Sequence, residues 1–116
     1  MKKPAIRKSK KLLLAVLLPG FALAQNAENG KRIFVKDGCY ECHGYAGQGT
    51  IAGARLAPPV LNAQGMIRYV RKPAGAMPAF TDKVLSDQEV NDIYAYLKTI
   101  PAPKPVKDIP LLNQIK

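Results

Sequence analysis

The sequence predicts an all-α protein of three to four short helices, and three observations lead to that prediction. Apolar residues recur at helical spacing at both ends of the segment 27–100. A Ser-x-x-Glu capping box opens the last of these stretches, and no strand-like alternation of useful length appears anywhere in the 116 residues. Gly-rich and Pro-containing stretches separate the helical ones and are typical of loops.

The first helix is predicted from about residue 27 to residue 37. Ala27, Gly30 and Phe34 fall at i, i+3 and i+7, and Gly38 follows as a C-terminal stop. A second short helix is predicted across residues 62–71.

The last helix is predicted to begin after Ser86, whose side chain would cap it while Glu89 reaches back. Four apolar residues then follow at i, i+3, i+7 and i+10: Val90, Ile93, Leu97 and Ile100. Pro101 ends the helix, because proline cannot continue it.

The first 24 residues have the pattern of a secretory signal peptide. A basic start without acids precedes the run Leu12 to Leu18, and Ala22-Leu23-Ala24 supplies small residues at a cleavage site. A permanent membrane anchor is the alternative. A helix from 12 to 24 would span only about 20 Å against roughly 30 Å of hydrocarbon, and Pro19 would break it. We therefore expect cleavage after Ala24 and a periplasmic location, with membrane association only if the segment stays uncleaved.

The basic charge of the whole chain comes largely from this first segment. Six of the 18 basic residues and none of the 8 acidic residues lie in it, so without it the formal net charge falls from +10 to +4. No interleaving of aromatic and basic residues accompanies that charge. Nucleic-acid binding is therefore not expected.

Both cysteines lie in Cys39-Tyr40-Glu41-Cys42-His43, a Cys-x-x-Cys-His haem-attachment motif. Two thiols three positions apart can each add to one vinyl group of the same porphyrin, and His43, the only histidine, can then offer its imidazole to the iron. The alternatives are a redox-active disulfide and half of a zinc site. No strand pattern precedes Cys39, and no further thiol or imidazole is present for zinc. The motif predicts one covalent haem c per chain.

Met77 is predicted to supply the second axial ligand that a low-spin electron carrier needs. Gly and Pro on both sides hold it on a rigid extended loop, within residues 73–80. A thioether ligand favours Fe(II) and raises the potential, which fits electron transfer rather than oxygen activation. The competitor is Met66, which lies in the second predicted helix, where a buried methionine ordinarily packs.

From about Ala27 to Ile100 the chain resembles the class I (mitochondrial-type) cytochromes c in their short bacterial form. The runs 30–35 and 93–97 resemble the family's first and last helices, and the Cys-x-x-Cys-His motif lies between them. The resemblance implies short helices wrapped around one covalently bound haem, with the terminal helices crossing at nearly a right angle. It also implies close approach at Gly30, contact of Phe34 with Ile93 and Tyr96, attachment at Cys39 and Cys42, and axial ligation by His43 and Met77.

One departure from the family concerns the hydrogen-bond acceptor for the proximal histidine. The family has Gly-Pro-x-Leu after the haem motif, and that proline's carbonyl accepts from the histidine. This chain has Gly53-Ala54-Arg55-Leu56 instead. The carbonyl of Ala54 and the nearby Pro58 are the two candidates.

The sequence also leads to predictions for two further segments, residues 71–72 and residues 101–116. Arg71 and Lys72, just before the methionine loop, could meet a haem propionate or a partner's acidic patch, or form a solvated basic face. Residues 101–116 contain four prolines and are predicted to form an extended, semi-rigid tail. The predicted organisation is thus a signal peptide at 1–24, a cytochrome c domain at 25–100 and the tail.

The expected function is that of an electron carrier and not an enzyme. It would pass single electrons between redox protein partners, from a dehydrogenase towards a terminal oxidase. A dedicated cytochrome subunit of a multi-subunit dehydrogenase would use the same chemistry. A haem enzyme or sensor with an open iron site, and a disulfide-bearing binding module without haem, are the alternatives of other classes.

Overall fold

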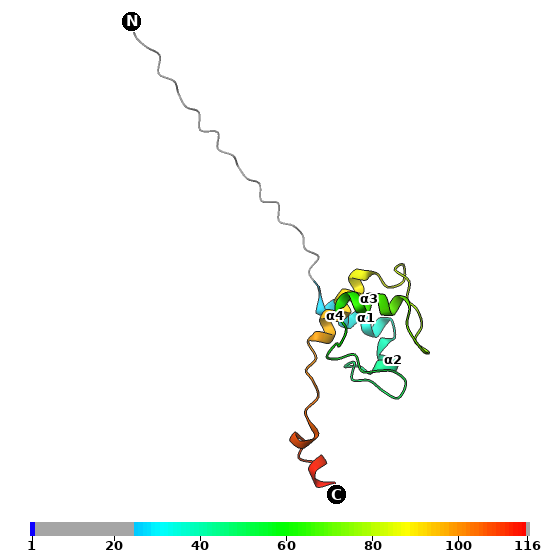
Figure 1. Cartoon of the computed structure of the whole chain (residues 1–116), viewed down its shortest axis with the longest axis vertical. Helices are drawn as coiled ribbons and strands as arrows, with labels where there is room; N and C mark the ends of the chain where they lie inside the picture. Colours follow the sequence, from blue (N-terminus) through cyan, green and yellow to red (C-terminus); the bar gives the residue numbers. More distant parts are fainter. Residues whose placement is uncertain (2–24, 116) are drawn as a thin grey trace.

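The computed structural model describes Met1 and residues 25–115, and residues 25–115 form four α-helices and no strand. The helices are α1 (Ala27–Lys36), α2 (Cys39–His43), α3 (Ala63–Arg71) and α4 (Asp87–Lys98). Figure 1 shows α1, α3 and α4 gathered together, with α2 and the loop after it extending to one side. The all-α prediction is confirmed. The predicted signal peptide lies, apart from Met1, outside the described residues.

Side-chain caps start the three longer helices. Asn26 Oδ1 accepts from the amide of Asn29 at 3.1 Å, and Asn62 Oδ1 accepts from that of Gly65 at 2.8 Å. Ahead of α4 the expected capping box is present in both directions, since Ser86 Oγ accepts from Glu89 N and Glu89 Oε2 accepts from Ser86 N. Each cap satisfies an amide that the helix leaves unpaired and stabilises it by about 1 kcal/mol.

The core forms where α1 and α4 pack against each other. Ile33, Phe34 and Leu97 are fully buried there, and the rings of Phe34 and Tyr96 lie 5.7 Å apart, centre to centre. Gly30 faces the backbone of α4 so closely that a Cβ would overlap the carbonyl of Asp92. The close approach expected at Gly30 and the contact expected between Phe34 and Tyr96 are therefore both present.

Asp92 is the buried acid of this interface, 4% exposed. Its carboxylate accepts hydrogen bonds from Asn26 N at 2.8 Å, Asn29 Nδ2 at 2.7 Å and Gln88 Nε2 at 3.0 Å. Burial alone would raise the pKa of Asp92, but these three donors outweigh it and hold the pKa below its ordinary value. The start of α1 is thus tied to α4 by hydrogen bonds as well as by apolar packing.

The chain beyond α4 leaves the packed helices (Figure 1). Residues 101–105 have no regular structure, and two short 3₁₀ turns follow, Val106–Asp108 and Leu112–Gln114. All residues from 101 to 115 are exposed except the half-buried Ile109. None of the helices in the described part of the chain is both long and apolar enough to cross a bilayer.

Candidate haem site

The short helix α2 carries both cysteines and the histidine of the predicted site. Glycines flank it, Gly38 with φ 73° and Gly44 with φ 77°, which are backbone angles that side chains of L-residues rarely adopt. Cys39 and Cys42 are both free thiols, Cys39 half-buried and Cys42 exposed. Residues three apart in a helix share a face, so this turn can present both sulfurs to one ligand.

The environment of Cys39 disfavours the thiolate. Burial, and then the negative charge of Asp37, raise the pKa of Cys39 to about 11. Redox-active cysteines in Cys-x-x-Cys motifs have lowered pKa values instead. The structure therefore argues against a thioredoxin-like disulfide site at this motif.

His43 is oriented by a single backbone acceptor. Its Nδ1 lies 2.6 Å from the carbonyl oxygen of Ala54, so Nδ1 carries the proton and donates. Of the two candidate acceptors, the structure thus selects Ala54 and not Pro58. Because Nδ1 carries the proton, Nε2 keeps the lone pair that a metal needs. The hydrogen bond to Ala54 also fixes the orientation of the ring.

The loop after α2 wraps back over the motif by contacts that sequence reasoning missed. Gly49 N donates to His43 O at 2.8 Å, and the Thr50 hydroxyl donates to Cys42 O at 2.5 Å. A Cβ on Gly53 would lie 2.7 Å from the same Cys42 oxygen, so only glycine lets Ala54 reach the histidine here. The Gly-rich composition predicted a loop, but no local pattern identifies which backbone groups such a loop returns to.

The two candidate methionines lie in different surroundings. Met66, in α3, is 8% exposed and belongs to the hydrophobic core. Met77 is half-buried and lies outside that core, on the loop between α3 and α4. The amide of Phe80 donates to Val70 O at 2.9 Å and closes this loop at its base. Met77 therefore has no packing role in the core of the described residues, whereas Met66 does.

The residues around α2 fit a haem in two respects. First, the described residues include the types of donor that a haem c requires: two thiols on one turn, an imidazole with its Nε2 available and, on a separate loop, a thioether. Second, the segment after α2 exposes large apolar side chains, with Ile51 and Val60 almost wholly exposed and Leu61 44% exposed. Apolar surface of this kind commonly marks the place of a ligand or partner.

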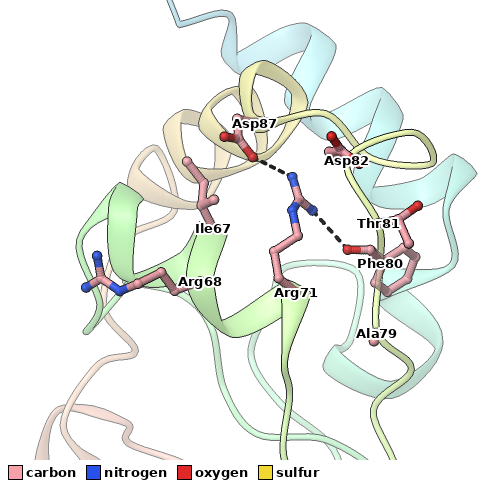
Figure 2. A pocket seen from close by; sticks show the side chains of 8 residues that line it. All are labelled: Ile67, Arg68, Arg71, Ala79, Phe80, Thr81, Asp82 and Asp87. Atoms are coloured by element: carbon pink, nitrogen blue, oxygen red, sulfur yellow. Dashed lines mark hydrogen bonds and ion pairs between the residues drawn. The ribbon is translucent and has the colours of Figure 1, made fainter.

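A cavity away from α2 is lined by none of the four predicted haem-binding residues, Cys39, Cys42, His43 and Met77. It has a volume of about 620 Å³ and lies between α3, residues 79–82 and the start of α4 (Figure 2). Arg71 is the last residue of α3, and its side chain extends across this cavity. A small hollow of about 50 Å³ is lined by Met66 and by loop residues 55, 56 and 59–61.

Comparison with known proteins decides the family. Residues 25–97 match the family described as "Cytochrome C oxidase, cbb3-type, subunit III". The chain belongs to this family of small c-type cytochromes. It is also 31% identical over 100 residues to cytochrome c-555 of Methylococcus capsulatus, covering 78% of this chain and 81% of that one.

The cytochrome is therefore an electron carrier of the class I type, with one covalent haem c. Cys39 and Cys42 fit the attachment motif. When bound, the haem iron supplies the one-electron Fe(III)/Fe(II) chemistry, and the protein supplies ligands, orientation and dielectric.

Proposed function

We propose that this cytochrome is an exported monohaem carrier whose haem is attached through Cys39 and Cys42 and ligated by His43 and Met77. The observation that carries the proposal is the hydrogen bond from His43 Nδ1 to the carbonyl of Ala54 at 2.6 Å. It fixes the orientation of the ring and leaves the lone pair of Nε2 available for a metal. A histidine held in this way, one residue after the second cysteine, is suited to be the proximal ligand.

The remaining residues have two roles: some hold the carbonyl that orients His43, and Met77 would keep small ligands from the iron. Thr50 and Gly53 hold the carbonyl of Ala54 beside α2. Met77, on a loop closed at its base by Phe80 and Val70, would fill the sixth position and keep small ligands from the iron. With His43 and Met77 as its two axial ligands, the site would be suited to electron exchange with partners and not to oxygen activation, which is the function proposed.

The electron donor and acceptor are proposed at the level of class. We propose that the mature protein begins at Gln25 in the periplasm and carries electrons from a dehydrogenase towards a terminal oxidase. The family's description names an oxidase subunit, which supports a link to an oxidase, and the similarity to cytochrome c-555 over most of the chain supports a small cytochrome as the carrier. A dedicated cytochrome subunit of a dehydrogenase is the second candidate, since the same haem chemistry would serve it.

Intact-mass analysis of the native protein tests attachment and export together. The expected mass is that of residues 25–116 plus one haem, and acid–acetone treatment should leave the pigment on the polypeptide. Cys39→Ala with Cys42→Ala should lose the covalent haem. Pigment that moves into the organic phase would refute the attachment, and a retained Met1 terminus would refute the cleavage.

A further inference from the structure

We infer that Arg71 is a positioning residue that holds the Met77 loop closed, by joining the end of that loop to the start of α4. The inference rests on the proposed role of Met77 as distal ligand. It concerns residues 72–80, which we call the Met77 loop, and the cavity of Figure 2 through which Arg71 extends.

The guanidinium of Arg71 joins the end of the Met77 loop to the start of α4 through one side chain. Its Nη1 donates to the carbonyl of Phe80 at 3.1 Å, and its Nη2 pairs with Asp87 Oδ1 at 2.5 Å (Figure 2). The amide of Phe80 donates to Val70 O at 2.9 Å. Both main-chain polar groups of Phe80, the last residue of the Met77 loop, are thus held by the end of α3.

The two hydrogen bonds of Arg71 should contribute unequally to closure of the Met77 loop. The Arg71 side chain is only 24% exposed, and its bond to Phe80 is partly buried, so that bond is charge-assisted and shielded from water. Asp87 is 64% exposed, so its ion pair is screened by solvent and should contribute less. We therefore assign most of the effect to the Phe80 carbonyl, with Asp87 aligning the guanidinium.

This geometry changes the expectation for Arg71 that the sequence allowed. A haem propionate, a partner's acidic patch and a solvated face were the alternatives, yet the guanidinium is engaged within the chain. Arg68 lines the same cavity from one turn earlier in α3, and its side chain points away from that of Arg71 (Figure 2). Among the described residues Arg68 makes no side-chain hydrogen bond or ion pair, so it is a matched control in position and charge.

Closure of the Met77 loop and ligation by Met77 are linked equilibria. A soluble ligand such as imidazole can take the sixth position only when the loop opens, so its apparent affinity is its intrinsic affinity multiplied by the open fraction. Weakening the closed loop raises that fraction. Imidazole affinity of the oxidised protein therefore measures what Arg71 does, independently of electron-transfer activity.

The test is a titration of the oxidised holoprotein with imidazole. Binding is monitored by the loss of the near-infrared sulfur-to-iron band. Arg71→Gln should bind imidazole at least about tenfold more tightly than wild type, as expected for loss of a shielded charge-assisted hydrogen bond. Arg68→Gln, with the same loss of charge, should stay within about twofold. Asp87→Asn should show a smaller increase than Arg71→Gln, and Arg71→Lys an intermediate one, because one ammonium replaces a two-armed donor.

Asp92→Asn separates this role from general loss of stability. It breaks hydrogen bonds between α1 and α4, so it should ease global unfolding in urea while leaving imidazole affinity at the wild-type value. Should Arg71→Gln fail to fold, Arg71→Lys decides: tighter imidazole binding supports the inference, and wild-type affinity overturns it.

Wild-type affinity in Arg71→Gln, or an equal increase in Arg68→Gln, would overturn the role of Arg71 while leaving Met77 as ligand. Absence of the near-infrared band in the wild-type protein would instead refute the proposed distal ligand itself.

Discussion

The Cα of Gly30 in α1 faces the backbone carbonyl of Asp92 in α4 with no room for a methyl group between them. This contact sets how closely the two helices approach, and the fully buried Phe34 and Leu97 pack beside it. The packing of Asp92, Phe34 and Leu97 thus depends on the absence of a side chain at Gly30.

Gly30→Ala should lower the free energy of unfolding by at least about 2 kcal/mol, because the added methyl would overlap main-chain atoms that cannot rotate away. Urea unfolding followed by far-UV circular dichroism measures it. Gly65→Ala, in α3, is the control: its Cβ would lie 3.2 Å from a side-chain oxygen of Asn62, and the change should stay within about 1 kcal/mol. Equal losses in the two variants would contradict the close helix contact.

Asp92→Asn should destabilise the protein at neutral pH by about 1–3 kcal/mol, since it replaces an acceptor of three hydrogen bonds. The pKa of Asp92 is lowered in the folded state, so its ionised form stabilises the fold above its unfolded-state pKa of about 4, and that stabilisation is lost as the pH falls through the lower folded-state pKa.

Urea titrations at several pH values check this. The difference between wild type and Asp92→Asn should be full near neutral pH and should shrink below about pH 4. A difference that does not change with pH would mean that the carboxylate charge plays no part. Asp82→Asn, on an exposed residue, should change the unfolding free energy by less than about 0.5 kcal/mol.

The parts of the fold that could be predicted from the sequence are those with local signals. Helical spacing and a capping box identified α4 and its start at Ser86, and spacing with Gly38 located α1 to within a residue. Loop composition separated Met77 from Met66, and the structure places Met66 in the core.

The rest depends on tertiary contacts. Any main-chain carbonyl can accept from His43, so Ala54 could be preferred to Pro58 only once the path of the loop 44–57 was known. Likewise a surface arginine ahead of a loop has many possible partners, and the bond from Arg71 to Phe80 follows from how the loop returns to α3.

Thr50→Val should weaken the support of the haem motif. It removes the hydroxyl that donates to Cys42 O and accepts from Ala52 N, at a cost of about 1 kcal/mol in unfolding free energy. Thr50→Ser retains the hydroxyl and should cost less than half as much. Thermal unfolding of the holoprotein, monitored in the haem absorption band, gives both values. If Thr50→Ser is as unstable as Thr50→Val, the hydroxyl is not what holds the loop.

The near-infrared spectrum of the oxidised protein tests the distal ligand most directly, and with it the assignment to electron transfer. We expect the weak sulfur-to-iron charge-transfer band in the wild type and in Met66→Leu, which keeps apolar volume in the core and should cost less than about 1.5 kcal/mol. Met77→Ala should lose the band, show a lower potential and bind carbon monoxide when reduced. A band that survives Met77→Ala but disappears in Met66→Leu would reverse the ligand assignment, and a wild type without the band would contradict the account.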